Sequence, residues 1–281
     1  MNILITGATG FLGKQVLKSL AKESVSIKII SRGNRDNFLT QFKNISEIIN
    51  TDNFFTESSQ WYEEICKDID IIIHVAWYAE PGKYLESPLN LECLAGTLNF
   101  AKSACKQGIK KFVGVGTCFE YDLSNSNPLD INAPLNPKFL YSIAKANVYA
   151  LLSKYFKNEN IEFLWTRVFY LYGEDEDERR LVAVLRKKLA LGEIVDLTSG
   201  SEIRDFMDVK IAGSMIAGAA LGMNVGPFNV CSGEGQSIRE LAESIADEYG
   251  KRELLNFGAR EDNLADSQSI VGLKTKILKT N

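Results

Sequence analysis

The sequence contains very little histidine and no long apolar segment, and each shortage excludes a class of protein. Its single histidine, His74, excludes histidine-rich metal sites and any Ser-His-Asp triad that does not use it. The five cysteines have no paired spacing, so we expect neither a disulfide framework nor a metal site. Apolar runs such as 69–76 are far too short to span a bilayer.

Excess charge of one sign is also missing. A net charge of −4 argues against a general nucleic-acid surface, although a local site can still bind an anionic small molecule. Met1 is followed at once by a strand-like stretch and not by a signal peptide, so we expect a cytoplasmic protein without membrane contact. With 281 residues and 45% hydrophobic content, the chain can bury a large core.

Short apolar runs alternate with amphipathic stretches along the first part of the chain. Strands are expected at 3–6, 26–31, 69–74, 111–115 and 162–167, and helices at 10–23, 59–67, 88–107 and 140–158. This alternation predicts an α/β fold with a doubly wound parallel sheet, the Rossmann arrangement. Ligands bind such sheets at the carboxyl ends of the strands.

The pattern changes after Gly173. An acidic run at 174–178, interpreted as a solvated loop, precedes a helix through Leu191, short strands near 195–198 and 228–231, and a helix at 237–249. We therefore expect residues 1–173 to form a dinucleotide-binding domain that carries the catalytic residues. Residues 174–281 should mostly form a smaller substrate lobe, with some chain returning to the main sheet.

Glycines at 7, 10 and 13 directly follow the first strand and begin the first helix. Small residues let backbone N–H groups approach a pyrophosphate, and the helix N-terminus favours its negative charge. The alternative is a tight turn with incidental glycines. In this context the motif predicts cofactor contacts from the following residues: Gly7, Thr9, Gly10, Phe11, Leu12 and Gly13.

The end of the second strand bears on which nicotinamide dinucleotide is bound. Ser31 and Arg32 supply a hydroxyl and a cation that suit a 2′-phosphate, so NADP(H) is favoured. Asp36 nearby keeps NAD(H) as the alternative, because a carboxylate there can accept hydrogen bonds from the ribose. Asp52 and Asn53 are expected near the adenine edge, after a poorly defined third strand.

Tyr141 and Lys145 lie four residues apart on a predicted helix and therefore share a face. An ammonium beside a phenol favours the phenolate and lowers its pKa, so this tyrosine can exchange a proton while a hydride moves to or from nicotinamide. Such a spacing also occurs as ordinary surface decoration of helices. Thr117, at the end of the strand 111–115, could hold the reacting oxygen as well.

These motifs resemble the extended short-chain dehydrogenases, the NAD(P)-dependent epimerase/dehydratase group. The resemblance runs through the segments 7–13, 74–76, 116–117, 141–145, 167, 172–173, 204–206 and 229–234. It implies Thr117 as the catalytic hydroxyl residue, Tyr141 as the acid/base, and Lys145 as its modulator and ribose anchor. It also implies cofactor contacts at Val75, Ala76 and Val168.

The same resemblance implies a nucleotide-diphosphate sugar as substrate, with Arg204 and Arg260 on its diphosphate. Corresponding helices of the family often form a four-helix bundle between two protomers, which implies a homodimer. Core packing accounts equally well for the apolar stripes on the helices at 88–107 and 140–158. Other residues expected to contact substrate are Trp77, Tyr78, Tyr84, Cys118, Phe119, Phe169, Tyr170 and Arg179. For the three aromatic residues of the loop after the fourth strand, loop packing is an equal alternative.

Departures from the family pattern narrow the reaction. The 4,6-dehydratases carry Asp-Glu after the hydroxyl residue, where this chain has Cys118 and Phe119. Fucose-synthase-like enzymes use a Cys two residues after the hydroxyl and a later His, and neither is present here. Galactose 4-epimerases usually have Asn where this chain has Tyr170. The reaction that remains compatible with these departures is hydride transfer at one carbon, with Tyr141 as the proton partner.

A narrower resemblance, in 197–206 and 232–240, is to reductases of the paratose/abequose-synthase type, which act in surface-polysaccharide assembly. It implies NADPH-dependent reduction of the 4-keto group of a nucleotide-diphospho-6-deoxy sugar. A nucleotide-sugar epimerase that retains its cofactor is the alternative. A non-catalytic NADP-sensing protein is the other, although it would have no use for Thr117, Tyr141 and Lys145 together.

Overall fold

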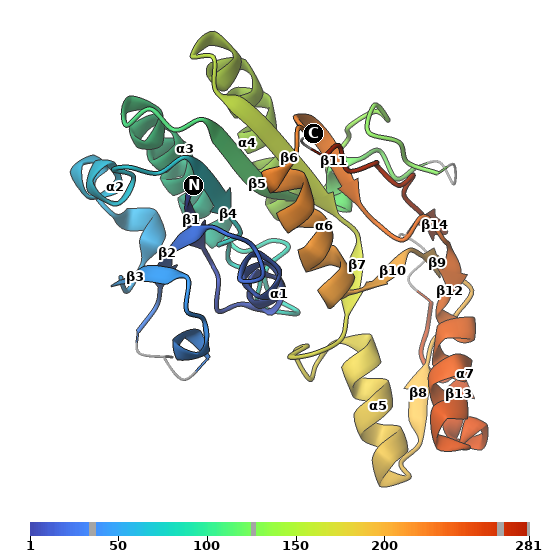
Figure 1. The fold of residues 1–281 in the computed structure, drawn as a ribbon. Coiled ribbons are helices and arrows are strands. Elements are labelled where there is room, and N and C mark those ends of the chain that lie inside the picture. Colours follow the sequence, from blue (N-terminus) through green and yellow to red (C-terminus); the bar gives the residue numbers. More distant parts are fainter. Residues whose placement is uncertain (34–37, 125–127, 263–266, 280–281) are drawn as a thin grey trace.

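A seven-stranded sheet forms the centre of the protein. The computed structural model describes residues 1–33, 38–124, 128–262 and 267–279. The strand order is β11-β6-β5-β4-β1-β2-β3, and every neighbouring pair is parallel. The strands are β1 (Asn2–Thr6), β2 (Ser26–Ser31), β3 (Ile45–Asn50), β4 (Ile71–His74), β5 (Lys111–Thr117), β6 (Glu162–Val168) and β11 (Gly226–Val230). The predicted Rossmann fold is confirmed (Figure 1).

Burial explains which strands the sequence pattern revealed. All residues of the central strand β5 are buried, so it forms a continuous run without polar alternation, as strands covered on both faces do. The edge strand β3 is only partly buried, and its pattern in the sequence is correspondingly weak. It nevertheless ends just before Asp52, so Asp52 and Asn53 do follow a strand of the sheet.

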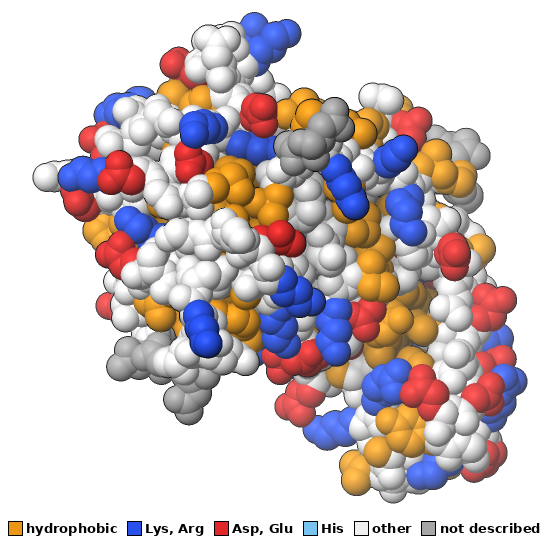
Figure 2. All heavy atoms as spheres, viewed as in Figure 1, with side chains coloured by type: hydrophobic (Ala, Val, Ile, Leu, Met, Phe, Trp, Pro, Cys, Tyr) orange, Lys and Arg blue, Asp and Glu red, His pale blue; other side chains and the backbone are white. Residues whose placement is uncertain are grey.

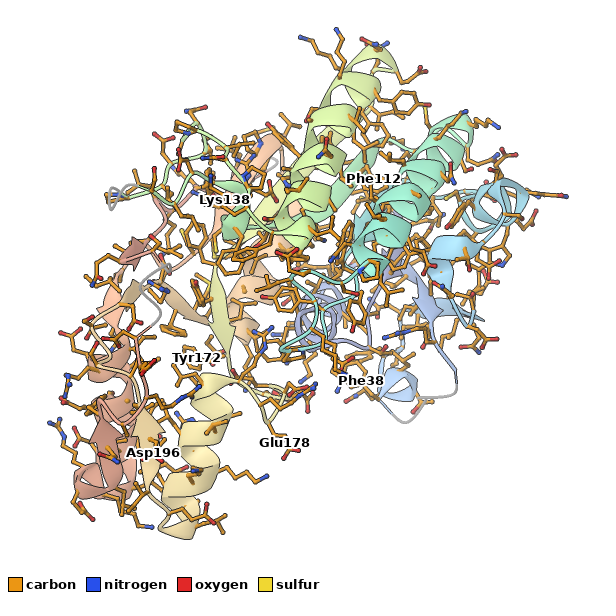
Figure 3. All side chains as sticks on the ribbon, turned by 180° about the vertical axis from the view of Figure 1, so that it is seen from behind. Phe38, Phe112, Lys138, Tyr172, Glu178 and Asp196 are labelled. Atoms are coloured by element: carbon orange, nitrogen blue, oxygen red, sulfur yellow. The ribbon has the colours of Figure 1, made fainter. Side chains whose placement is uncertain are left out.

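Helices cover both faces of the sheet. One face packs against α1 (Phe11–Leu20) and α6 (Val209–Leu221). The two helices approach closely at Gly213, where a Cβ would lie 2.6 Å from Gln15 Cβ. The other face packs against α2 (Ser59–Ile65), α3 (Leu89–Lys106) and α4 (Leu140–Asn158). Phe112, fully buried on this second face, is labelled in Figure 3.

A second hydrophobic cluster lies away from the sheet. It joins α5 (Leu181–Leu191) and α7 (Ile238–Tyr249) to the parallel pair β8 (Val195–Leu197) and β13 (Leu255–Phe257). Figure 1 shows these four elements together at one end of the molecule. The chain leaves this end through β10 (Phe206–Asp208) and α6 and then adds β11 to the edge of the main sheet.

Short elements connect the two parts. Strand β7 (Tyr170–Tyr172) pairs in parallel with β10 (Phe206–Asp208), and β9 (Ile203–Arg204) lies between β12 (Gln236–Ser237) and β14 (Ser269–Ile270). The 3₁₀ turns are η1 (Leu39–Gln41), η2 (Phe54–Thr56), η3 (Cys118–Glu120) and η4 (Arg252–Leu254). Within the described ranges, no helix combines the length and the apolar character that a membrane span requires.

Charges of both signs are interspersed on the face drawn in Figure 2. Glu174 and Asp175, at the start of the acidic run, are exposed to solvent, and both pair with lysines of neighbouring helices. Glu174 pairs with Lys18 of α1 at 2.6 Å and with Lys210 of α6 at 3.3 Å, and Asp175 pairs with Lys14 at 2.8 Å. These ion pairs connect the acidic run, which leads into the smaller cluster, to α1, the helix that follows the glycine motif.

Candidate active site

The glycine motif forms a tight cradle at the carboxyl end of β1. Gly7 has a φ of +74°, and a Cβ there would lie 2.6 Å from the backbone nitrogen of Ala76. A Cβ at Gly13 would lie 2.0 Å from the carbonyl oxygen of Gly7. Only glycine therefore lets the loop pack against Val75 and Ala76 while the N-terminus of α1 stays accessible to a phosphate.

A second feature of the cradle fits the adenosine half of a dinucleotide. Ser31 ends β2 with 3% of its surface exposed, and its hydroxyl has no hydrogen-bond partner among the described residues. A buried hydroxyl of this kind suits a ligand oxygen. Arg32 beside it is exposed, whereas Asn53 uses its side chain to cap η2 and to bind Glu92. Asp52 is exposed, and Asp36 lies outside the described residues.

The structure brings the three expected catalytic residues together. Thr117 ends β5, and its hydroxyl is hydrogen-bonded to that of Tyr141 on α4. Lys145 follows one turn later, and its ammonium donates to the carbonyl of Val115 at 2.6 Å. That ammonium lies 5.9 Å from the centre of the Tyr141 ring. The cluster joins one strand end to one helix face, as expected from the spacing.

Burial dominates the electrostatics of this pair. The pKa of Lys145 is lowered to about 7 by burial, which the Cys93 and Glu120 side chains oppose. The pKa of Tyr141 is raised, first by burial and then by Tyr84 and Glu120, while the Thr117 hydrogen bond works the other way. The spacing of Tyr141 and Lys145 predicts a lowered pKa for the phenol, whereas in the structure this pKa is raised.

A buried glutamate that the sequence analysis missed supports Thr117. Glu120 is completely buried and accepts hydrogen bonds from the Thr117 backbone at 2.9 Å, the Trp165 indole at 3.0 Å and Arg167 Nε at 2.9 Å. Burial raises its pKa, and Arg167 lowers it. Arg167 continues the network to Tyr121 at 3.2 Å. The only early signal was the position of Glu120, three residues after the hydroxyl residue.

Aromatic residues of the loop after β4 surround the catalytic pair. The Tyr84 ring meets the Tyr141 ring edge-on, with centres 4.9 Å apart. Trp77 lies under Lys145, with 3.8 Å between its ring centre and the ammonium. Tyr78 turns instead toward Glu80, to which its hydroxyl donates at 3.1 Å. Trp77 and Tyr84 thus touch the catalytic residues, while Tyr78 does not.

The expected substrate residues after β5 and β6 form a separate wall. Phe119 and Tyr170 meet edge-on with ring centres 6.0 Å apart, whereas Phe169 and Cys118 belong to a buried cluster behind them. Burial raises the pKa of the Cys118 thiol to about 12, so it is uncharged at neutral pH. Val168, the last residue of β6, is partly buried beside the sheet core.

The expected substrate cations occupy different environments. Arg204 is 4% exposed, donates to the carbonyls of Ile203 and Ser267, and lies 5.7 Å from the Tyr170 ring centre. Arg260 is exposed. Arg179 has half of its side chain exposed and is bound to Asp177 at 2.8 Å.

Arg180, which the sequence analysis did not single out, faces the site instead. Its guanidinium lies 5.9 Å from the Phe11 ring centre, and its charge lowers the pKa of Tyr84 against the effect of burial. It is partly buried, and its side chain has no hydrogen bond or ion pair with the described part of the chain. Among these cations, Arg180 is thus the one near both Phe11 of the glycine motif and Tyr84 of the loop after β4.

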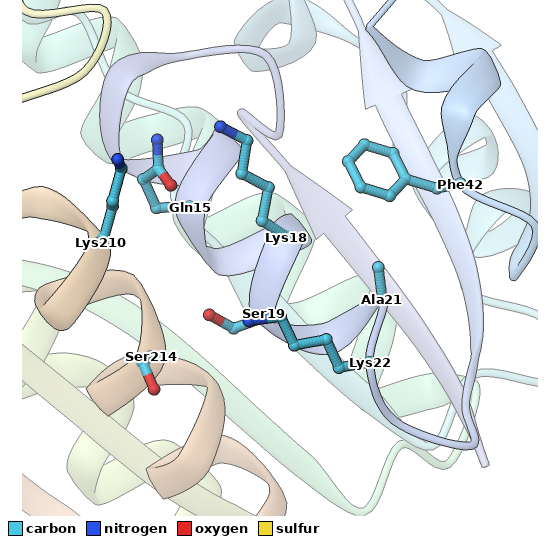
Figure 4. Close-up of a pocket in the computed structure, with 8 residues that line it drawn as sticks. All are labelled: Gln15, Lys18, Ser19, Ala21, Lys22, Phe42, Lys210 and Ser214. Carbon is cyan, nitrogen blue, oxygen red and sulfur yellow. The ribbon is translucent and has the colours of Figure 1, made fainter.

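A groove of about 460 Å³ between α1 and α6 is distinct from this site (Figure 4). It is lined by Gln15, Lys18, Ser19, Ala21, Lys22, Phe42, Lys210 and Ser214. None of the three expected catalytic residues borders it, and two of its lysines are paired with Glu174. The groove is therefore separate from the cluster at the carboxyl ends of β4 and β5.

The fold and this cluster define a dinucleotide-binding Rossmann enzyme. The model of the NAD dependent epimerase/dehydratase family matches residues 3–217, and the chain belongs to that family. It is 27% identical over 277 residues to dTDP-6-deoxy-L-talose 4-dehydrogenase (NAD(+)) of Aggregatibacter actinomycetemcomitans, covering 98% of this chain and 100% of that protein. It is 26% identical over 297 residues to CDP-abequose synthase of Salmonella muenchen, covering 98% and 91% of the two chains.

Solved structures show the same fold. UDP-glucose 4-epimerase of Thermotoga maritima, determined with UDP-glucose, superposes with a TM-score of 0.85 at 20% identity, covering 98% of this chain and 90% of that one. dTDP-glucose 4,6-dehydratase of Streptomyces venezuelae, determined with NAD, gives a TM-score of 0.83 at 19% identity, covering 98% and 88%. The chain is thus an enzyme of a nucleotide-sugar-modifying, NAD-dependent family.

Proposed function

We propose that this enzyme reduces the 4-keto group of a nucleotide-diphospho-6-deoxy sugar with NADPH. The observation that carries the proposal is the composition of the catalytic cluster. Tyr141 can transfer a proton, while its neighbours Cys118 and Phe119 supply neither the acid nor the base that loss of water requires. The relatives named above act, by their names, on dTDP-6-deoxy-L-talose at the 4-position or form CDP-abequose.

The residues divide the work as follows. When bound, the nicotinamide supplies the hydride that adds to the carbonyl carbon. The Tyr141 hydroxyl donates the proton that the carbonyl oxygen takes up, and Thr117 holds that oxygen through its own hydroxyl. Lys145, as a cation, stabilises the phenolate left on Tyr141 until a proton returns. Carbonyl, hydride and proton together balance to an alcohol.

The cradle and the cations recognise the two phosphate-bearing molecules. Gly7, Gly13 and Ser31 hold the dinucleotide, and Arg32 beside Ser31 favours the 2′-phosphate of NADP. We assign Arg204 and Arg180 to the diphosphate of the sugar nucleotide. Arg204 is buried near the Tyr170 ring, and Arg180 is partly buried near the Phe11 ring. We assign residues 174–281 mostly to the substrate lobe.

A homodimer in the cytoplasm is part of the proposal. Large apolar side chains are exposed on α3 and α4, namely Leu89, Leu91, Ile143 and Leu151. A second copy of this chain would cover them. Sedimentation of the wild type as a dimer, and of Leu151→Glu as a monomer, is the expected result.

The decisive experiment follows NADPH oxidation at 340 nm with CDP-, dTDP- and GDP-linked 4-keto-6-deoxy sugars, with NADH in parallel. Oxidation with one sugar nucleotide supports the ketoreductase and identifies both the base and the cofactor. An isomerised sugar without net oxidation would instead support an epimerase. Binding of cofactor with neither outcome would support the sensing protein.

A further inference from the structure

Asn90 holds the aromatic loop from below. It lies in the first turn of α3 and is completely buried. Its Oδ1 accepts a hydrogen bond from the Trp77 indole at 2.8 Å, and its Nδ2 donates to the carbonyls of Tyr84 at 2.6 Å and Ser87 at 2.9 Å. One amide therefore fixes both the Trp77 side chain and the backbone from which Tyr84 projects.

The Trp77 and Tyr84 rings both contact the catalytic pair, and the Trp77 ring also meets the Tyr141 ring edge-on at 6.4 Å. The Trp77 ring centre is 3.8 Å from the Lys145 ammonium, and the Tyr84 ring meets Tyr141 edge-on at 4.9 Å. A cation over an indole face is attracted most strongly where both are removed from water. The ammonium also donates a hydrogen bond to the Val115 carbonyl at 2.6 Å.

The charged and titratable groups around Lys145 do not replace that contact. Glu120 of η3 faces it but is already hydrogen-bonded to Arg167, Trp165 and the Thr117 backbone. The remaining neighbours are the Cys93 thiol from α3, the Tyr141 phenol one turn earlier, and His74 from β4, which burial keeps neutral. After the Val115 carbonyl at 2.6 Å, the indole face at 3.8 Å is thus the other close group that favours the charged amine.

We propose that Asn90 and Trp77 are positioning residues for Lys145: Asn90 fixes the indole, and the indole face keeps the lysine protonated and in place beside Tyr141. The catalytic consequence rests on the proposed function, whereas the effect on the lysine itself does not. An aromatic residue that merely fills space would leave the titration of Lys145 unchanged.

The test is an NMR titration of protein labelled at lysine ¹³Cε, with the Lys145 signal assigned by its absence in Lys145→Arg. Trp77→Leu, which keeps apolar bulk without a π face, should lower the midpoint by about one pH unit. Trp77→Phe keeps a face and should shift it by less than half as much. The matched control is Trp61→Phe on α2, whose ring meets Phe54 and Tyr62, and it should titrate like the wild type. An unchanged midpoint in Trp77→Leu, or equal shifts in Leu and Phe, would overturn the proposal.

Asn90→Ala tests the anchor. It should lower the midpoint in the same direction as Trp77→Leu, because the indole loses its hydrogen-bond acceptor. A midpoint equal to that of the wild type would remove Asn90 from the proposal. If the variant does not fold, Trp77→Phe removes the same hydrogen bond from the other side, and a measurable shift there is required.

Kinetics separate this inference from the proposed function. With a sugar nucleotide that is reduced, Trp77→Leu should lower kcat about tenfold and change KM less than about twofold, since the arginines that we assign to the diphosphate are unchanged. NADPH oxidation by the wild type together with an unshifted Lys145 midpoint in Trp77→Leu means that this inference fails and the function holds. A shifted midpoint without oxidation of NADPH by the wild type on any sugar means the reverse.

Discussion

The carboxyl edge of the sheet and the smaller hydrophobic cluster hold their polar side chains in different ways. At the sheet edge, Thr117, Tyr141 and Lys145 are fixed by one strand end and one helix face, and burial shifts the pKa of the last two. In the second half of the chain, cations range from the buried Arg204 to the exposed Arg260. Regular elements thus hold the candidate catalytic residues, whereas the cations considered for substrate binding lie on short strands and in loops.

The largest effect should come from the sheet edge. Tyr141→Phe removes the proton donor and keeps the ring, so turnover should fall at least about a hundredfold. Cofactor affinity, measured by fluorescence titration with NADPH, should stay within about twofold because the glycine cradle is untouched. Wild-type turnover in this variant would show that another group carries the proton.

Loss of packing in the smaller cluster should lower the free energy of unfolding more than loss of a surface charge does. Leu185 of α5 is completely buried, while the next residue, Arg186, has 41% of its side chain exposed and is paired with Glu248. Leu185→Ala should lower the free energy of unfolding by about 2–5 kcal/mol. Arg186→Gln should lower it by less than about 1 kcal/mol. Urea unfolding of both variants measures the difference, and equal losses would refute it.

Two adjacent arginines test which side of the loop before α5 meets the substrate. Arg180 faces Phe11 and Tyr84, whereas Arg179 is bound to Asp177 at the surface. Arg180→Gln should raise KM for the sugar nucleotide about 10- to 100-fold, the value of a lost charge-assisted contact. Arg179→Gln should raise it less than about threefold. The opposite ranking would return Arg179 to the role that the sequence analysis expected.

Loss of stability at acid pH should also arise in the main sheet. His74 is bound to Thr6 at 2.7 Å and Thr97 at 3.0 Å, and burial, assisted by the Lys145 charge, lowers its pKa from 6.5 to about 3. As the pH falls, the unfolded chain therefore binds a proton at His74 before the folded chain does. The free energy of unfolding decreases by about 1.4 kcal/mol per pH unit as the pH falls from about 6.5 toward 3.

The check is urea unfolding at pH 7 and pH 5 for the wild type and His74→Gln. The loss between the two pH values should be smaller in the variant by about 2 kcal/mol, because its side chain does not titrate. The smaller cluster contains no histidine, since His74 is the only one in the chain. Identical losses in both proteins would place the acid sensitivity elsewhere.

The predictability of the fold follows burial. Strands β1, β2, β4, β5 and β6 have strongly apolar patterns, and the sequence alone located them. The edge strand β3 and two- or three-residue strands such as β9 and β12 have no pattern long enough to recognise. Their pairing comes from segments distant in the chain, such as Ile203 and Ser269.

The site divides in the same way. Thr117, Tyr141 and Lys145 could be named because their spacing is local, although their catalytic roles remain predictions. Arg180 could not be distinguished from Arg179, because only the direction of the chain at the start of α5 separates them. Asn90 gave no signal at all, since its partners are the indole of Trp77 and two carbonyls of an irregular loop.

The sequence by itself determined the family, the doubly wound sheet and the glycine cradle, because each depends on residues that are close together in the chain. Only the tertiary structure decided which side chains surround Lys145, how Glu120 supports Thr117, and which arginine faces the site. Most of those contacts join residues tens of positions apart, such as Trp77 and Lys145. Burial then sets their electrostatics, and burial is a property of the packed molecule.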